Sequence, residues 1–161
     1  MQAITFWKAV TVDQTNLLEQ FITLLTEHQI QYCVVGGQAV NAYAEPLVSL
    51  DLDLVVATDQ LKQVKALLRG SFQVKSFPHS LNISSLGSDL RIQIQTDPRY
   101  ASFPQRAELR NILGITLPVA HLEDVLQGKI WAVQDPTRRA SKRQKDLADI
   151  ARLLETYPNL R

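Results

Sequence analysis

The sequence has little of several features that would assign a chain to a specialised class. It contains one cysteine, Cys33, in 161 residues, which excludes an internal disulfide and any zinc site built on two or more cysteines. No apolar run approaches the roughly 18 residues of a membrane span, and residues 1–10 lack the basic start and apolar core of a signal peptide. We therefore expect a cytoplasmic protein that makes no membrane contact.

An excess of charge of one sign is also missing. The chain has 17 lysines and arginines against 16 aspartates and glutamates, a formal net charge of +1. Strong DNA binding is therefore not expected, and any contact with nucleic acid must be local. Hydrophobic residues make up 45% of the chain and charged residues 20%, which excludes disorder. At this length we expect residues 1–161 to form one domain.

Hydrophobic periodicity predicts both helices and strands. Helical spacing of apolar residues predicts helices at residues 17–25, 38–44, 61–68, 121–134 and 141–156. Short apolar runs predict strands at Tyr32–Val35, 50–56, 72–77, 79–84 and 90–95, while residues 97–118 are expected to form a loop with short strands. Residues 11–14 form a capping-box pattern, and Thr58 is expected to cap a helix. The order predicts an α/β (α+β) fold, a mixed sheet flanked by helices, mainly on one face.

Two aspartates lie on one predicted strand, in the segment DLDLVV. Asp51 and Asp53 are two residues apart, so both side chains point to the same face, and Leu52 and Leu54 point to the other. Aspartate is rare in strands, and two neighbouring carboxylates repel each other. A divalent cation would compensate for this repulsion, because Mg²⁺ takes oxygen ligands and is often held by one or two carboxylates together with substrate phosphates.

A diglycine follows the first predicted strand. Gly36 and Gly37 let the backbone approach a phosphate closely, and a helix that begins just after them offers free N–H donors. The alternative is a simple turn, with both aspartates facing water on an open sheet. The order and spacing of the two motifs together favour chemistry that uses phosphate and metal.

These residues also carry a resemblance to a known family. The segments GGQA (36–39) and SLDLDL (49–54) resemble the signature of the DNA polymerase β-type nucleotidyltransferase superfamily. Residues 118–120, a following helix with Lys129, and the segment KDLADI (145–150) resemble the minimal, abortive-infection-toxin-like branch of that superfamily. The resemblance extends over most of the chain, from about Gln29 to Leu154.

The resemblance implies a function and roles for individual residues. It implies binding of Mg²⁺ and a nucleoside triphosphate, and transfer of a nucleoside monophosphate to a hydroxyl group. Gly36 and Gly37 would contact the triphosphate, and Asp51 and Asp53 would hold the metal ions. Ser49 is a further candidate for a nucleotide contact. The acceptor could be RNA, a protein or a small molecule, and the branch implies an antitoxin partner.

The sequence departs from the family at one candidate catalytic position. The family places a third carboxylate on a later strand, and Gln93 stands there in the segment RIQIQ (91–95). Glutamine is neutral at every pH, so it cannot act as a base, and it is a poor Mg²⁺ ligand. We expect Gln93 to lie beside the two aspartates and to donate an amide hydrogen bond to one of them. A catalytically impaired nucleotide-binding or interaction module is therefore the alternative to an enzyme.

Several basic residues near the C-terminus are less diagnostic. Lys129 falls within the apolar stripe of its predicted helix, so it either reaches phosphate or the Asp51 and Asp53 pair, or extends along the surface to water. Basic residues crowd the start of the last helix, at 138, 139, 142, 143 and 145. The favoured interpretation of this run is a solvated helix end, with a bound phosphate as the alternative.

Overall fold

A computed structural model describes residues 17–112 and 114–160 of the chain. The predicted capping box at residues 11–14 lies outside these residues. The α-helices are α2 (Leu17–Glu27), α3 (Gly36–Tyr43), α4 (Leu61–Arg69), α5 (Leu122–Gln134) and α6 (Ala140–Thr156). The strands are β1 (Tyr32–Val35), β2 (Asp51–Val56), β3 (Gln73–Phe77), β4 (Ser80–Ser84), β5 (Arg91–Gln95), β6 (Glu108–Ile112) and β7 (Ile115–Val119). None of the described helices is long and apolar enough to cross a membrane.

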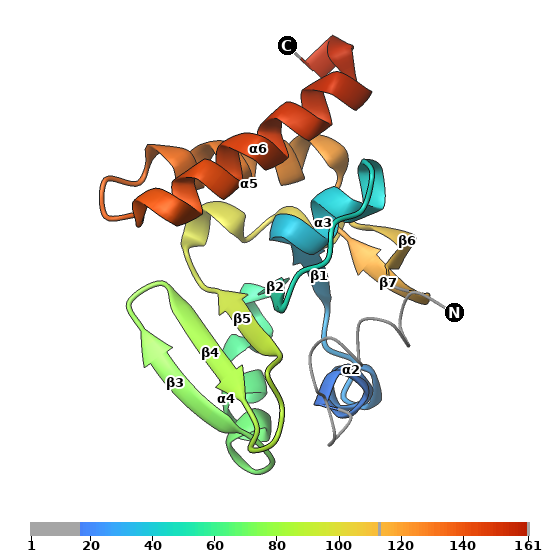
Figure 1. The fold of residues 1–161 in the computed structure, drawn as a ribbon. Coiled ribbons are helices and arrows are strands. Elements are labelled where there is room, and N and C mark those ends of the chain that lie inside the picture. Colours follow the sequence, from blue (N-terminus) through green and yellow to red (C-terminus); the bar gives the residue numbers. More distant parts are fainter. Residues whose placement is uncertain (1–16, 113, 161) are drawn as a thin grey trace.

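The strands form one mixed sheet, as the sequence predicts. Seven strands follow the order β3-β4-β5-β2-β1-β7-β6. The pairs β2–β5 and β1–β7 are parallel, and the other neighbours are antiparallel. The middle of the sheet, β5-β2-β1, therefore joins segments that lie far apart in the sequence (Figure 1).

Helices flank the sheet on both faces, which corrects the expectation that they lie mainly on one face. Leu52 and Leu54 of β2 are fully buried in the core that also contains the inner faces of α2 and α4. Asp51 and Asp53 alternate with these leucines and line a cleft together with residues of α3, α5 and α6. These three helices lie together on the other face of the sheet from α2 and α4 (Figure 1). The sheet therefore has an apolar face packed by α2 and α4, and a second face where polar groups of the strands meet α3, α5 and α6.

Local differences from the sequence predictions have identifiable causes. Helix α3 begins at Gly36, two residues earlier than predicted, because the diglycine forms its first turn. Thr58 does not cap α4: it begins a 3₁₀ turn, Thr58–Gln60, and α4 starts at Leu61. Cys33 is fully buried in β1, and burial raises the pKa of its thiol to about 12, so it packs in the core as an inert side chain.

The region from 97 to 118 is more regular than expected. It contains two 3₁₀ turns, Pro98–Tyr100 and Phe103–Arg106, and then the hairpin of β6 and β7. The strand β7 was not predicted because it contains Pro118, and proline, which has no N–H, is rare within sheets. Here Pro118 lies opposite Leu109 of the edge strand β6, and the pairing of β7 with β1 is at the next residue, Val119. The hairpin therefore extends the sheet beyond β1.

The hairpin register makes a testable prediction about stability. Leu117 of β7 is 3% exposed, and Leu109 of β6 is 71% exposed. We expect Leu117→Ala to lower the free energy of unfolding by about 2–4 kcal/mol, because it leaves a cavity in the core. Leu109→Ala should change it by less than about 0.5 kcal/mol. Urea denaturation of both variants measures the difference, and equal losses would contradict the register.

Candidate active site

The register of the three central strands gathers the predicted site residues. Asp53 of β2 pairs with Val35 of β1 on one side and with Gln93 of β5 on the other. Asp51 and Asp53 line one cleft of about 650 Å³, as the shared strand face predicts. Gly37, Ser49, Gln93 and Lys129 are also among the residues that line this cleft.

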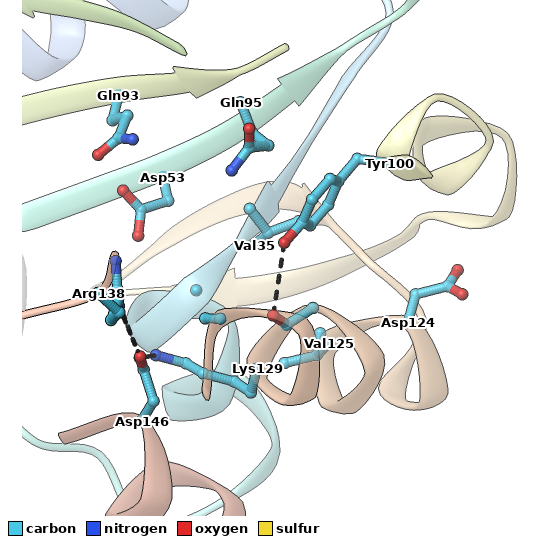
Figure 2. A pocket seen from close by; sticks show the side chains of 13 residues that line it. Val35, Asp53, Gln93, Gln95, Tyr100, Asp124, Val125, Lys129, Arg138 and Asp146 are labelled. Atoms are coloured by element: carbon cyan, nitrogen blue, oxygen red, sulfur yellow. Dashed lines mark hydrogen bonds and ion pairs between the residues drawn. The ribbon is translucent and has the colours of Figure 1, made fainter. Parts of the chain in front are cut away.

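A smaller pocket of about 80 Å³ adjoins the cleft (Figure 2). Gly36 lies in its wall together with Val35 and Tyr100. Asp53, Gln93, Lys129, Arg138 and Asp146 line both spaces. Asp53 therefore lies where the pocket at Gly36 meets the wider cleft.

Gly36 is required by a close approach of Asp53. Its φ is +68°, in the left-handed region that side chains other than glycine rarely adopt. A Cβ at this position would also collide with Oδ2 of Asp53 and lie 3.1 Å from its Cγ. At Gly37 the nearest atom to an added Cβ is Oδ2 of Asp149 at 3.8 Å, an ordinary contact. The two glycines therefore differ: Gly36 is fixed by local geometry, whereas Gly37 is not.

The two aspartates have different electrostatic surroundings. Burial raises the pKa of Asp53 above its ordinary value; Lys129 opposes this shift, and the charge of Asp51 adds to it. Asp51 instead forms an ion pair with Arg91, with 2.8 Å between Oδ1 and the arginine Nε. Asp53 is therefore the carboxylate whose charge most needs compensation.

Ser49 lies two residues before β2 and is buried. Its hydroxyl accepts a hydrogen bond from the backbone N–H of Asp51 at 3.1 Å, and its carbonyl accepts one from the buried amide of Gln38 at 3.2 Å. These bonds link α3 to the beginning of β2. Ser49 thus holds the Asp51 backbone in place in addition to lining the cleft.

Gln93 lies where the sequence places it, but one predicted contact is wrong. The side chain is beside Asp53, in the same row across the sheet (Figure 2). Among the described residues, no hydrogen bond joins the Gln93 amide to Asp51 or Asp53. The surroundings of the two carboxylates therefore differ because Asp51 pairs with Arg91 and Asp53 is buried, and not because Gln93 bonds to one of them.

Lys129 is buried, but its ionic partners are on α6. Its Nζ lies 3.0 Å from Oδ1 of Asp146 and 2.8 Å from Oδ2 of Asp149. No ion pair among the described residues joins Lys129 to Asp51 or Asp53, so that expectation is wrong, and so is the alternative of a side chain extending to water. Because Lys129 lines the cleft, contact with a phosphate stays a prediction. Burial acts to lower the pKa of Lys129, yet the two aspartates outweigh it and the pKa is raised. The cation therefore stays charged and ties α5 to α6.

Two arginines complete this buried network. Arg138 binds Asp146, with 2.8 Å between Nε and Oδ2, and Arg152 binds Asp149, with 2.7 Å between Nη2 and Oδ1. Burial acts to raise the pKa of Asp149, but Lys129 and Arg152 outweigh it and the pKa is lowered. Each of the two aspartates thus has two cationic neighbours (Figure 2 shows those of Asp146).

The basic run at the start of α6 is largely exposed, since Arg139 and Lys145 face solvent, which agrees with the favoured interpretation of a solvated helix end. Arg139, Lys142 and Lys145 line the cleft opposite Asp51 and Asp53. Arg143 instead donates to the carbonyl oxygens of Val133 and Asp135, at 3.2 and 2.8 Å, where α5 ends. We call Arg139, Lys142 and Lys145 the basic wall. It faces the two carboxylates across the cleft, an arrangement that suits an anion held by cations on one side and by a metal on the other.

The donor set fits one magnesium ion. Asp51 and Asp53 supply two carboxylates on one face, and Mg²⁺ commonly takes one or two carboxylates with substrate phosphates and waters. Among the described residues there is no group of three or more His, Cys, Asp or Glu side chains that could hold a metal ion. The site is thus suited to an ion that the substrate helps to bind.

Sequence reasoning missed two residues that shape the site. Arg91 shares its strand face with Gln93, and the β2–β5 register would have placed it opposite Asp51. Asp149 lies three residues after Asp146, which puts both on one face of α6. The helical spacing of Asp146 and Asp149 was therefore a signal for the network. It did not identify Lys129 as their partner, because that contact depends on how α5 packs against α6.

Solved structures share this fold, a mixed sheet flanked by helices, at low sequence identity. The solution structure of the antibiotic-resistance factor ANT(2'')-Ia matches with a TM-score of 0.63 and 15% identity, over 92% of this chain and 89% of that one. The lincosamide antibiotic adenylyltransferase LnuA, lincomycin-bound, matches with a TM-score of 0.58 and 12% identity, over 89% and 99%. A putative nucleotidyltransferase from Thermotoga maritima matches with a TM-score of 0.54 and 13% identity, over 90% and 92%.

The chain belongs to the AbiEii family, described as nucleotidyl transferase AbiEii toxin of a type IV toxin–antitoxin system. The family model matches residues 58–161, more than half of the chain. This confirms the resemblance to the abortive-infection-toxin-like branch. The matched part begins after Asp51 and Asp53, so the two aspartates are supported by geometry and not by that match. No curated protein matches the sequence.

The contrast between the two glycines can be tested by substitution. We expect Gly36→Ala to lower the free energy of unfolding by about 2 kcal/mol or more, because it combines a left-handed φ with a collision against Asp53. Gly37→Ala should leave it unchanged or raise it by up to about 1 kcal/mol, since alanine favours a helix. Thermal or urea unfolding of both variants measures this, and equal effects would show that Asp53 does not approach Gly36 as described.

The raised pKa of Asp53 makes a pH-dependent prediction. A carboxyl whose pKa is higher in the folded protein than in the unfolded chain destabilises the fold above that pKa, and the cost disappears as the group is protonated. Asp53→Asn should therefore be more stable than the wild type at pH 7 without metal, and the difference should shrink as the pH falls toward the ordinary value for aspartate. Asp51→Asn should show no such gain, because it loses the ion pair with Arg91. Urea denaturation between pH 4 and 8 measures both; a gain for Asp53→Asn that persists in acid would contradict the shift.

Proposed function

We propose that the protein is a metal-dependent nucleotidyltransferase. It binds a nucleoside triphosphate with Mg²⁺ and transfers the nucleoside monophosphate to a hydroxyl group. The observation that carries the proposal is one cleft lined by Asp51 and Asp53 on one side and by the basic wall on the other, with the diglycine beside Asp53. Family membership supports the same class of reaction.

The chain's own groups suit each part of the triphosphate. Val35 precedes α3 and provides no side-chain cap in the described structure, so the N–H groups of the first turn, at Gly36 and Gly37, suit phosphate oxygens. The basic wall offers further charge to the phosphates. Asp51 and Asp53 would hold the magnesium ion, which supplies charge neutralisation at the phosphates when bound.

The transfer exchanges one bond to phosphorus for another. The acceptor oxygen bonds to the α-phosphorus, the bond between the α-phosphorus and the bridging oxygen breaks, and pyrophosphate leaves. The acceptor loses its proton to solvent or to a base. Gln93 cannot take it, because an amide has no basic form at these pH values. General base assistance is typically worth about 10²–10⁴-fold, so we expect a slow enzyme.

The proposal identifies the acceptor by its chemical class. ANT(2'')-Ia has been solved with adenylyl-2''-tobramycin, and LnuA with lincomycin. A hydroxylated small molecule is therefore one acceptor to test, beside RNA and protein. A second cavity of about 390 Å³, lined by Asp97, Trp131 and Asp135 among others, shares Gln95, Tyr100 and Arg138 with the pocket at Gly36 and could admit an acceptor. The family description also supports an antitoxin partner.

A second function, nucleotide binding without turnover, is favoured by one specific observation. Gln93 stands in the row of Asp53 at the position where the family resemblance implies a carboxylate. Such a module would keep Mg²⁺-dependent binding of triphosphate but would release no pyrophosphate with any acceptor. Binding alone therefore does not separate the two functions, whereas product formation does.

The metal role of the two aspartates can be tested by binding. We expect the double variant Asp51→Asn, Asp53→Asn to bind a fluorescent ATP analogue roughly 100-fold more weakly in Mg²⁺, because the ion loses both charged ligands. Wild-type binding should weaken similarly when the metal is removed with EDTA. Asp59→Asn is the matched control, since Asp59 is exposed and does not line the cleft. Unchanged Mg²⁺-dependent binding in the double variant would show that Asp51 and Asp53 do not bind the metal ion.

A further inference from the structure

Arg91 is a cation that lies directly beside one of the two carboxylates of β2. It pairs with Asp51 in the β2–β5 register, and its Nε lies 2.8 Å from the Asp51 carboxylate. The side chain is 66% exposed and lines the cleft. An exposed pair of this kind is screened by water and is weak, so the guanidinium is able to leave Asp51 for another anion without a large cost.

The charge of this face is correspondingly small. β2 contributes two carboxylates, whereas the β5 residues on the same face are one cation and two neutral amides: Arg91, Gln93 and Gln95. Formally the five groups sum to one negative charge. Two divalent ions bring four positive charges, and the described residues contain no cluster of three acidic or other metal-binding side chains to receive them.

The other carboxylates around the site do not supply a third metal ligand. Asp146 lines the cleft and the adjoining pocket, but it is held by Lys129 and Arg138. Asp124 lines the adjoining pocket, but it is held by Arg106, with 2.8 Å between Oδ2 and Nε. Asp97 follows β5, but it is held by Arg99, with 3.0 Å between Oδ2 and Nη2, and it lines the second cavity instead of the cleft. Asp89 precedes β5 and is not among the residues that line the cleft or the adjoining pocket. A bridging ligand for a second ion is thus missing from the described residues around Asp53.

We propose that the site takes a single divalent cation, and that Arg91 provides the second positive charge beside it. The cation would bind to Asp53 and Asp51 together with phosphate oxygens, and Arg91 would turn from Asp51 to the bound phosphates. This inference rests on the proposed function, since the triphosphate supplies the remaining oxygen ligands. In this arrangement Arg91 compensates negative charge of the bound phosphates. Gln93 supplies no carboxylate, so a second ion lacks a ligand.

The arrangement predicts a change in the number of ions when β5 is altered. Arg91→Gln together with Gln93→Asp replaces one positive charge by a neutral group and one neutral group by a carboxylate. The face then carries three carboxylates and no cation, so a second ion gains a bridging ligand. Arg91→Gln alone frees Asp51 and should tighten binding of a single ion to the protein without nucleotide, by roughly two- to fivefold.

The probe is Mn²⁺ with the non-hydrolysable analogue α,β-methylene-ATP, measured on the purified protein by electron paramagnetic resonance. Two Mn²⁺ ions about 4 Å apart in a shared site couple magnetically, whereas a single ion gives an uncoupled six-line spectrum. We expect one uncoupled ion per chain in the wild type and a coupled pair in the double variant. Arg99→Gln is the matched control, since Arg99 is also an exposed arginine paired with an aspartate but lies outside the cleft. It should keep one uncoupled ion.

Each other outcome overturns a defined claim. A coupled pair in the wild type would overturn the single-cation site while leaving the proposed function in place. A single uncoupled ion in the double variant would show that Arg91 and Gln93 do not set the number of ions. If the wild type bound no Mn²⁺ in the presence of the analogue, the proposed function itself would fail together with this inference.

Discussion

The register of β2 between β1 and β5 is the constraint on which the site depends. It places Val35, Asp53 and Gln93 in one row and brings Asp53 against the glycine that follows β1. A shift of one residue would turn Asp51 and Asp53 toward the core and Leu52 and Leu54 toward the cleft. The burial of those leucines therefore fixes the orientation of the carboxylates, and packing on one face of the sheet determines the chemistry on the other.

A buried ionic network holds the opposite wall of the cleft. Lys129 on α5 lies between Asp146 and Asp149 on α6, and Arg138 and Arg152 each pair with one of these aspartates, so that the three cations exceed the two carboxylates by one charge. Burying such groups costs desolvation, so a network of this kind is weak evidence for stability. Its structural consequence is orientation: α6 is held on α5 so that Arg139, Lys142 and Lys145 face the two carboxylates.

The sequence predicted those parts of the structure that depend on local patterns. Alternation in DLDLVV predicted that Asp51 and Asp53 share a face, and the family register predicted Gln93 beside them; both are confirmed. The partners of Lys129 and the Asp51–Arg91 pair were not predicted, because each pair joins elements far apart in sequence. The hairpin of β6 and β7 was hidden by Pro118, whose place in a strand depends on which neighbour it faces. Local periodicity thus determined the elements, whereas tertiary packing determined the charge partners.

The central claim is that this cleft performs nucleotidyl transfer although Gln93 replaces a carboxylate. The most direct test is transfer of label from α-³²P-labelled ATP, GTP, CTP and UTP to a panel of acceptors, namely total RNA, protein and hydroxylated antibiotics, in Mg²⁺. The account predicts slow, Mg²⁺-dependent labelling of one acceptor class with release of pyrophosphate, and loss of both in Asp53→Asn. Tight Mg²⁺-dependent triphosphate binding without pyrophosphate release or labelling of any acceptor would contradict the claim and favour a nucleotide-binding module.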